Sequence, residues 1–166
     1  MRRQVLSLLV ENTSGVVSHI SGLFSRRAFN IDSFSAGVTA DERFTRITIV
    51  STGEENDLEQ IKKQLAKLED VIDIKELKSG DSVCRELLLV KVAVDTKGRR
   101  SVLDIVDGFR ANVLDWAHDS LIIELTGDQG KLDAFLSLLD DYEILELART
   151  GFTGLSRGTS DVIMLD

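Results

Sequence analysis

The sequence predicts an α+β chain made of two successive βαββαβ units. Strand-length aliphatic runs alternate along the 166 residues with segments whose apolar residues recur at helical spacing. The same order of elements occurs in both halves, and the polar, glycine-containing break near the midpoint is residues 78–82. These three observations favour two similar small domains over one larger domain.

The first unit opens with a strand, a turn and a helix. Residues 4–10 are a strand-length aliphatic run that ends in a turn-like segment. Apolar residues at helical spacing over residues 16–27 predict a helix. Thr13 and Ser14 precede this helix and are expected to cap it, because Ser and Thr are preferred at helix starts.

The rest of the first unit contains three strands and a second helix. Residues 31–39 and 45–52 are predicted as strands, and in the second of them isoleucine alternates with polar residues. Apolar residues at helical spacing over residues 58–68, after an acidic start, predict a helix. Residues 71–77 complete the unit as its fourth strand.

The pattern recurs after the midpoint break. Strands are expected at residues 86–94, 113–116, 121–126 and 144–148, and helices over 102–109 and 132–139. Two βαββαβ units imply two ferredoxin-like sandwiches, each a four-stranded antiparallel sheet with two helices on one face. We therefore expect domains at residues 1–78 and 84–166.

The first strand of each unit carries aliphatic residues on both faces, although the helices would cover only one face. Such an uncovered face promotes aggregation, so either the other half of the chain or a second protomer must cover it. The alternative is that these strands are simply central and apolar. Because the pattern occurs in both halves, we expect an obligate oligomer.

Composition excludes several classes of function. The chain has 28 Asp and Glu against 20 Lys and Arg, a net charge of −8, which disfavours nucleic-acid binding. One Cys and two His allow no internal disulfide and no soft-ligand metal cluster. The apolar run near the N-terminus is too short for a signal peptide or a membrane span. We expect a cytoplasmic protein with no membrane partner.

The turn over residues 11–15 is a candidate ligand site. A glycine-containing turn before a helix directs free backbone N–H groups at one place, which suits a carboxylate or a phosphate. Asn12 adds an amide that both donates and accepts hydrogen bonds, as a zwitterion requires, and Val16 and Val17 could bound an apolar side chain. On these residues alone an ordinary N-cap turn is the favoured interpretation.

No constellation of residues indicates catalysis. His19 is expected on the polar side of a helix and His118 in a hairpin turn, and Cys84 has no adjacent His to activate its thiol. The turn before the first helix lacks the lysine and glycine pattern of nucleotide-binding loops. Asn30 lies at a helix-to-strand corner, where Asn by itself suits a turn. We predict no catalytic residues and no metal ligands.

Several segments closely resemble one known family, the acetolactate synthase (acetohydroxyacid synthase) small regulatory subunit. Residues 8–16 (LLVENTSGV), 22–27 (GLFSRR) and 29–31 (FNI) resemble its N-terminal ACT domain. Residues 85–92 (RELLLVKV), 127–135 (GDQGKLDAF) and 148–158 resemble its C-terminal domain. The matches occur in order over nearly the whole chain.

The resemblance implies a subunit with no catalysis and no cofactor of its own. It would bind a large catalytic subunit that carries thiamine diphosphate, FAD and Mg²⁺, raise its activity, and confer inhibition by valine, leucine or isoleucine. In the family two ACT domains pair side by side, so the resemblance implies a homodimer with the effector between protomers. The implied effector residues are Asn12, Thr13, Ser14, Gly15, Val16 and Val17 of one protomer and Asn30 and Ile31 of the other.

Two other interpretations remain open. The chain could be a stand-alone tandem-ACT amino-acid sensor that regulates another enzyme or transcription, or a small enzyme on a ferredoxin-like scaffold. Residues 149–158 could be a frayed tail or a structured segment at an interface. Ala28 replaces the glycine usual in the family, and would carry about 1 kcal/mol of strain if that position needs a positive φ.

Overall fold

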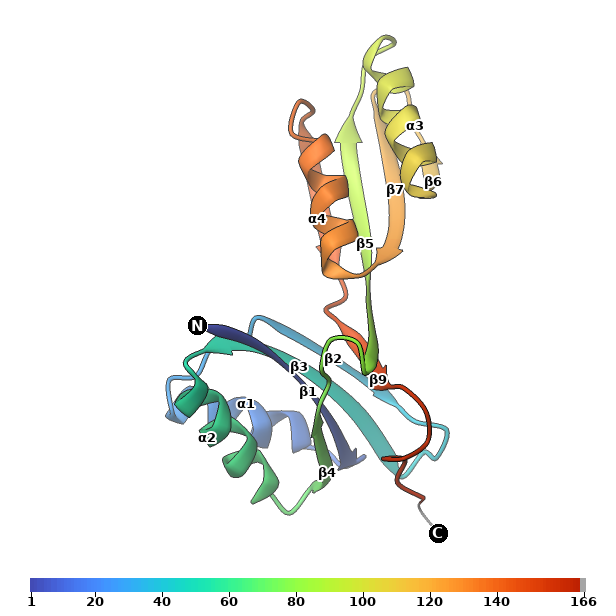
Figure 1. The fold of residues 1–166 in the computed structure, drawn as a ribbon. Helices are drawn as coiled ribbons and strands as arrows, with labels where there is room; N and C mark the ends of the chain where they lie inside the picture. Colours follow the sequence, from blue (N-terminus) through green and yellow to red (C-terminus); the bar gives the residue numbers. More distant parts are fainter. Residues whose placement is uncertain (165–166) are drawn as a thin grey trace. The chain divides into compact units, whose positions relative to one another are not determined.

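The computed structural model describes residues 1–164, which form two compact units (Figure 1). The first unit contains Met1–Cys84 and the segment from Phe152 onward, and the second is Arg85–Gly151. No helix among the described residues is long and apolar enough to cross a membrane.

The first unit is a four-stranded antiparallel sheet with both helices on one face (Figure 1). Its elements are β1 (Arg2–Glu11), α1 (Val16–Arg26), β2 (Ser33–Val38), β3 (Phe44–Gly53), α2 (Glu55–Ala66) and β4 (Val71–Glu76). The strand order is β2-β3-β1-β4. The predicted βαββαβ sandwich is confirmed.

Every second residue of β1 from Leu6 to Val10 contributes to the core of the first unit. Leu6, Leu8 and Val10 are fully buried and face the helices, where Phe24 of α1 and Leu58 of α2 join the same cluster. Each such side chain stabilises the fold by about 1.5–3 kcal/mol relative to leaving it in water. The core therefore fixes β1 and α1, and with them the turn that connects the two.

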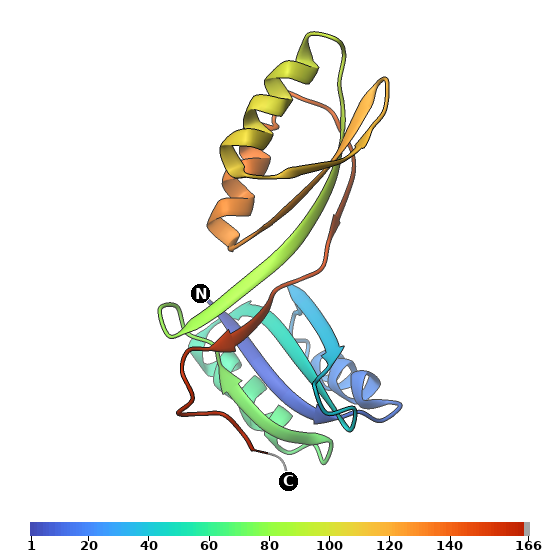
Figure 2. The ribbon, with the colours of Figure 1, turned by 90° about the vertical axis from the view of Figure 1, so that its right-hand side faces the viewer.

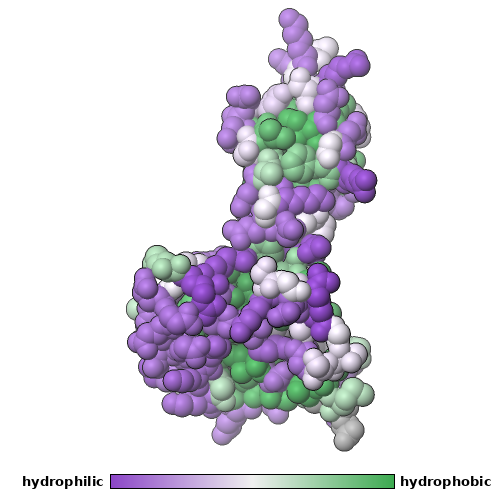
Figure 3. Space-filling model, in the orientation of Figure 1, coloured by the Kyte–Doolittle hydropathy of each residue, from purple (hydrophilic) through white to green (hydrophobic). Residues whose placement is uncertain are grey.

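The second unit repeats the architecture. Its elements are β5 (Ser82–Ala93), α3 (Gly98–Phe109), β6 (Asn112–Trp116), β7 (Ser120–Gly127), α4 (Gln129–Leu138) and β8 (Ile144–Arg149). The antiparallel strands follow the order β6-β7-β5-β8. Phe109 and Phe135 meet edge to face at 5.4 Å between ring centroids, and hydrophobic surface gathers between α3 and α4 (Figure 3).

The C-terminal segment departs from the predicted domain of residues 84–166. Strand β9 (Thr153–Ser156) pairs with β5, which starts inside the first unit (Figure 2). Phe152 packs into a cluster with Val5, Val50 and Leu77 of the first unit. This segment therefore belongs to the first unit, because the open face of β1 and β3 leaves an apolar patch that an aromatic ring fills. The frayed-tail alternative is wrong for residues 153–156.

The open face of the first sheet is thus covered in part by the chain itself. Beside the Phe152 cluster the face becomes polar, and the Arg46 guanidinium donates a hydrogen bond to Ser7 Oγ at 2.8 Å. At one end the Arg3 guanidinium lies over the Phe152 ring, 4.9 Å from its centroid. The sequence left open whether another part of the chain or a second protomer covers this face. Over its apolar end the cover is the chain's own C-terminal segment.

Candidate functional site

Asn12 joins the turn before α1 to the loop between β2 and β3. Its backbone N–H donates to the carbonyl oxygen of Arg43 at 2.8 Å, and its Nδ2 donates to that of Glu42 at 2.9 Å. Thr45 Oγ1 donates to Asn12 Oδ1 at 3.2 Å. Since a side-chain amide has two N–H groups and two lone pairs on its oxygen, one donor and one acceptor stay available to a ligand.

The start of α1 has no side-chain cap. Gly15 is the N-cap residue, with a left-handed backbone (φ +91°), and the first turn of the helix contains no acidic residue. The prediction that Thr13 and Ser14 cap this helix is wrong, because the chain turns at Gly15 and places a residue without a side chain at the cap. Backbone N–H groups at such a start attract an anion.

The two valines after this turn have different environments. Val16 is buried in the core of the first unit, whereas the Val17 side chain is 47% exposed beside the turn. Of the two predicted apolar contacts, only Val17 therefore offers its side chain at the surface. The four residues before them, Asn12 to Gly15, are all exposed.

The remaining predicted site residues follow the other end of α1. Asn30 is exposed and its Nδ2 donates to Asp32 Oδ1 at 2.5 Å, while Ile31 is half-buried against the core. Helix α1 has 11 residues, which corresponds to a length of about 16 Å. Within one chain the two groups of predicted residues are thus not brought together.

Ala28 has a left-handed backbone, so it lies at the positive-φ position where the sequence predicts strain. Its φ is +55°, and it ends α1 in a Schellman motif: Phe29 N–H donates to Phe24 O at 3.0 Å, and Ala28 N–H donates to Ser25 O at 3.3 Å. The positive φ makes alanine strained here.

Four charged or titratable side chains near the turn form two hydrogen-bonded pairs. Arg43 donates hydrogen bonds to Asp41 from its side chain and backbone, and these lower the pKa of the Asp41 carboxyl below its ordinary value. His19 Nδ1 lies 2.8 Å from Asp70 Oδ2. In the described part of the chain, no three His, Cys, Asp or Glu side chains are grouped to hold a metal ion.

Glu42 and Thr45, the partners of Asn12, were not predicted from the sequence. Thr45 faces Val10 in the β1–β3 register, two residues before Asn12, and Glu42 lies in the loop before β3. This pairing depends on how β1 aligns with β3, which no local pattern reveals.

Comparison with known proteins identifies similarity over both units. Residues 6–73 match the family described as AHAS small subunit-like ACT domain, and residues 85–158 match the small subunit of acetolactate synthase. The acetolactate synthase small subunit of Mycobacterium bovis is 46% identical over 157 residues, covering 95% of this chain and 94% of the relative. The isozyme 3 small subunit of Escherichia coli is 45% identical, covering 94% of this chain and 96% of the relative.

A solved structure has the same fold. The crystal structure of the acetolactate synthase small subunit from Thermotoga maritima superposes with a TM-score of 0.87 at 34% sequence identity. The match covers 95% of this chain and 99% of that one.

Proposed function

Because the chain belongs to the acetolactate synthase small-subunit family, we propose that it regulates the large catalytic subunit of that enzyme. It raises the activity of the large subunit and makes that activity sensitive to valine or another branched-chain amino acid. Thiamine diphosphate, FAD and Mg²⁺ belong to the large subunit, and this chain contributes no catalytic group. The observation that carries the proposal is the exposed, uncapped start of α1.

A free amino acid fits the turn before α1. Its carboxylate accepts hydrogen bonds from the backbone N–H groups of the first turn, where the helix dipole favours negative charge. The unused donor and acceptor of Asn12 serve the carboxylate and the ammonium group. Val17 offers an exposed aliphatic contact to the side chain of the ligand.

A second copy of the chain completes the site. Asn30 and Ile31 follow the far end of α1 within one chain, so a partner must bring its own pair to the turn. Strand β2 lies at an edge of the sheet, and its sequence, SFSAGV, carries neither charge nor proline. Such an edge is suited to pairing with another strand, which supports a side-by-side homodimer.

Because the effector contacts both protomers, it can shift the equilibrium between two states of the dimer. A ligand shifts a conformational equilibrium only by the difference between its affinities for the two states. An amino acid held by both protomers binds more tightly to the dimer state that keeps the two half-sites together. The activity of the large subunit then follows from which dimer state binds to it.

The test is acetolactate formation by the cognate large subunit, with and without this chain, across a valine titration. Asn12→Ala and Gly15→Asp are expected to raise the valine concentration for half-inhibition by about tenfold or more, with activation retained. Gly15→Asp adds a negative charge at the carboxylate position, and Gly80→Asp is its matched control. Gly80 also has a positive φ (+89°) and open space around it, but lies in the turn before β5.

The outcomes separate the parts of the proposal. A wild-type inhibition curve for Asn12→Ala would show that the site is assigned to the wrong residues. A chain that leaves the activity of the large subunit unchanged contradicts the regulatory role. Valine binding without retention of the large subunit would instead indicate a stand-alone amino-acid sensor.

A further inference from the structure

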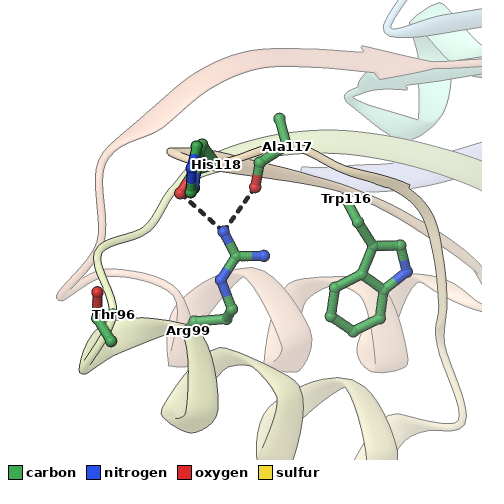
Figure 4. Close-up of a pocket in the computed structure, with 5 residues that line it drawn as sticks. All are labelled: Thr96, Arg99, Trp116, Ala117 and His118. Atoms are coloured by element: carbon green, nitrogen blue, oxygen red, sulfur yellow. Dashed lines mark hydrogen bonds between the residues drawn. The ribbon is translucent and has the colours of Figure 1, made fainter.

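One corner of the second unit forms a hollow of about 480 Å³ that the effector site does not use. It lies between the loop before α3 and the turn joining β6 to β7 (Figure 4). The residues that line it are Thr96, Arg99, Trp116, Ala117 and His118. No carboxylate side chain is among them.

Two hydrogen bonds hold the Arg99 side chain in this corner. Its Nη2 donates to the carbonyl oxygens of Ala117 at 2.6 Å and of His118 at 2.8 Å. Figure 4 shows the guanidinium between these carbonyls and the Trp116 indole. Within residues 1–164 Arg99 forms no ion pair, so the N–H groups on its Nε and Nη1 stay available to an outside anion.

Trp116 is the one tryptophan of the chain, and its side chain is 59% exposed. Leu114, on the same short edge strand β6, is exposed as well. This edge strand therefore exposes two large apolar side chains, one of them beside the Arg99 guanidinium. Tryptophan and arginine are, with tyrosine, enriched among the residues that contribute most binding energy to protein interfaces.

We propose that the corner around Arg99 and Trp116 is a docking surface for the large catalytic subunit. The partner presents an Asp or Glu carboxylate to Arg99 and an apolar side chain to the Trp116 indole. This inference rests on the proposed function and names the part of the chain that carries it out.

Charge and preorganisation favour this occupant. The chain carries a net charge of −8, so an acidic partner is repelled by most of its surface and is attracted where a cation has no internal partner. Because two backbone carbonyls already fix the Arg99 guanidinium, binding orders little additional side chain. The hollow is open to solvent and one of its walls is a flat indole, which suits a protruding side chain of a protein.

The test measures how much of this chain is needed to half-activate the large subunit. Trp116→Ala is expected to raise that concentration by about tenfold or more, the effect of truncating an interface hot spot. The maximal activity and the valine concentration for half-inhibition stay at their wild-type values. Leu138→Ala is the matched control, since Leu138 is 51% exposed in the same unit but lies at the end of α4.

A second measurement needs no substitution. Because the chain has one tryptophan, 5-fluorotryptophan labelling gives a single ¹⁹F signal from Trp116. Adding unlabelled large subunit is expected to change its chemical shift and to abolish its shift difference between H₂O and D₂O. A complex that forms by gel filtration while Trp116 keeps its solvent-dependent shift overturns the inference.

Failure of the inference and failure of the proposed function are distinguishable. If the wild-type chain activates the large subunit and Trp116→Ala does so at the same concentration, or shifts it no more than Leu138→Ala, the docking surface is wrong and the regulatory role stands. If the wild-type chain neither binds nor activates the large subunit, the proposed function fails and the docking surface fails with it.

Discussion

The first helices of the two units occupy the same place in the same fold, yet they start differently. The N-cap residues, Gly15 in α1 and Lys97 in α3, both lack a side-chain cap hydrogen bond. At the start of α3, however, Asp95 Oδ1 accepts a hydrogen bond from the Gly98 N–H at 2.5 Å. In the second unit a carboxylate of the chain itself thus lies where an external carboxylate would bind. A shared fold does not imply a shared ligand site, because a few turn residues decide whether the helix start is open.

The open faces of the two sheets differ as well. In the first unit Phe152 covers the apolar end of the face formed by β1 and β3. In the second unit Leu89 and Ile122 lie half-buried on a shallow hollow of about 200 Å³, beside the ion pair of Lys91 and Glu146 (3.0 Å). The C-terminal segment thus gives the first unit a cover that the second unit does not receive from residues 1–164.

Removing that cover is the largest predicted perturbation. Phe152→Ala empties a site where the side chain is 6% exposed, and we expect it to lower the free energy of unfolding by about 3 kcal/mol. Urea unfolding followed by circular dichroism measures the change. Leu155→Ala, on the same strand β9 but 62% exposed, serves as the control and should change it by less than about 0.5 kcal/mol. Equal effects of the two variants would show that Phe152 is not the cover of the first sheet.

The difference between the two helix starts is tested by removing the Asp95 carboxylate, which lies just before α3. Asp95→Ala leaves the Gly98 N–H without its partner and is expected to cost about 1 kcal/mol of unfolding free energy. Valine inhibition of the reconstituted enzyme should not change, because the effector site lies in the other unit. A loss of valine sensitivity comparable to that of Gly15→Asp would contradict the contrast between the two helix starts.

The fold was predictable because its signals are local. The first strand shows as a strand-length aliphatic run, Ile47 and Ile49 alternate with polar residues in β3, and the apolar residues of each helix recur at a fixed spacing. The C-terminal segment was misplaced because the site for Phe152 is assembled from Val5, Val50 and Leu77, which are far apart in the sequence.

The candidate site was only partly predictable. Its position follows from the order strand, turn and helix, but the caps expected at Thr13 and Ser14 fail because the chain reverses direction at Gly15 instead. The partners of Asn12 depend on the pairing of β1 with β3. The local sequence is enough to locate the turn, but the alignment of β1 with β3 determines which residues its side chains contact.

The ends of the same two helices give the smallest predicted effect. Ala28 after α1 and Arg110 after α3 both have left-handed backbones, with φ of +55° and +56°. Left-handed geometry costs a residue with a Cβ about 1–2 kcal/mol, and glycine loses roughly 0.5–1 kcal/mol more chain entropy on folding. Ala28→Gly and Arg110→Gly should therefore each stabilise the protein by about 0.5 kcal/mol in urea unfolding.

The matched control is the same substitution at a helical backbone. Ala66→Gly, at the last residue of α2, should lower the free energy of unfolding by about 0.5–1 kcal/mol, since glycine there gains nothing from its tolerance of positive φ. Opposite signs for Ala28→Gly and Ala66→Gly isolate the backbone conformation as the cause. If Ala28→Gly also destabilised the protein, the end of α1 would not be strained; if Arg110→Gly nevertheless stabilised it, the two units would differ at this position too.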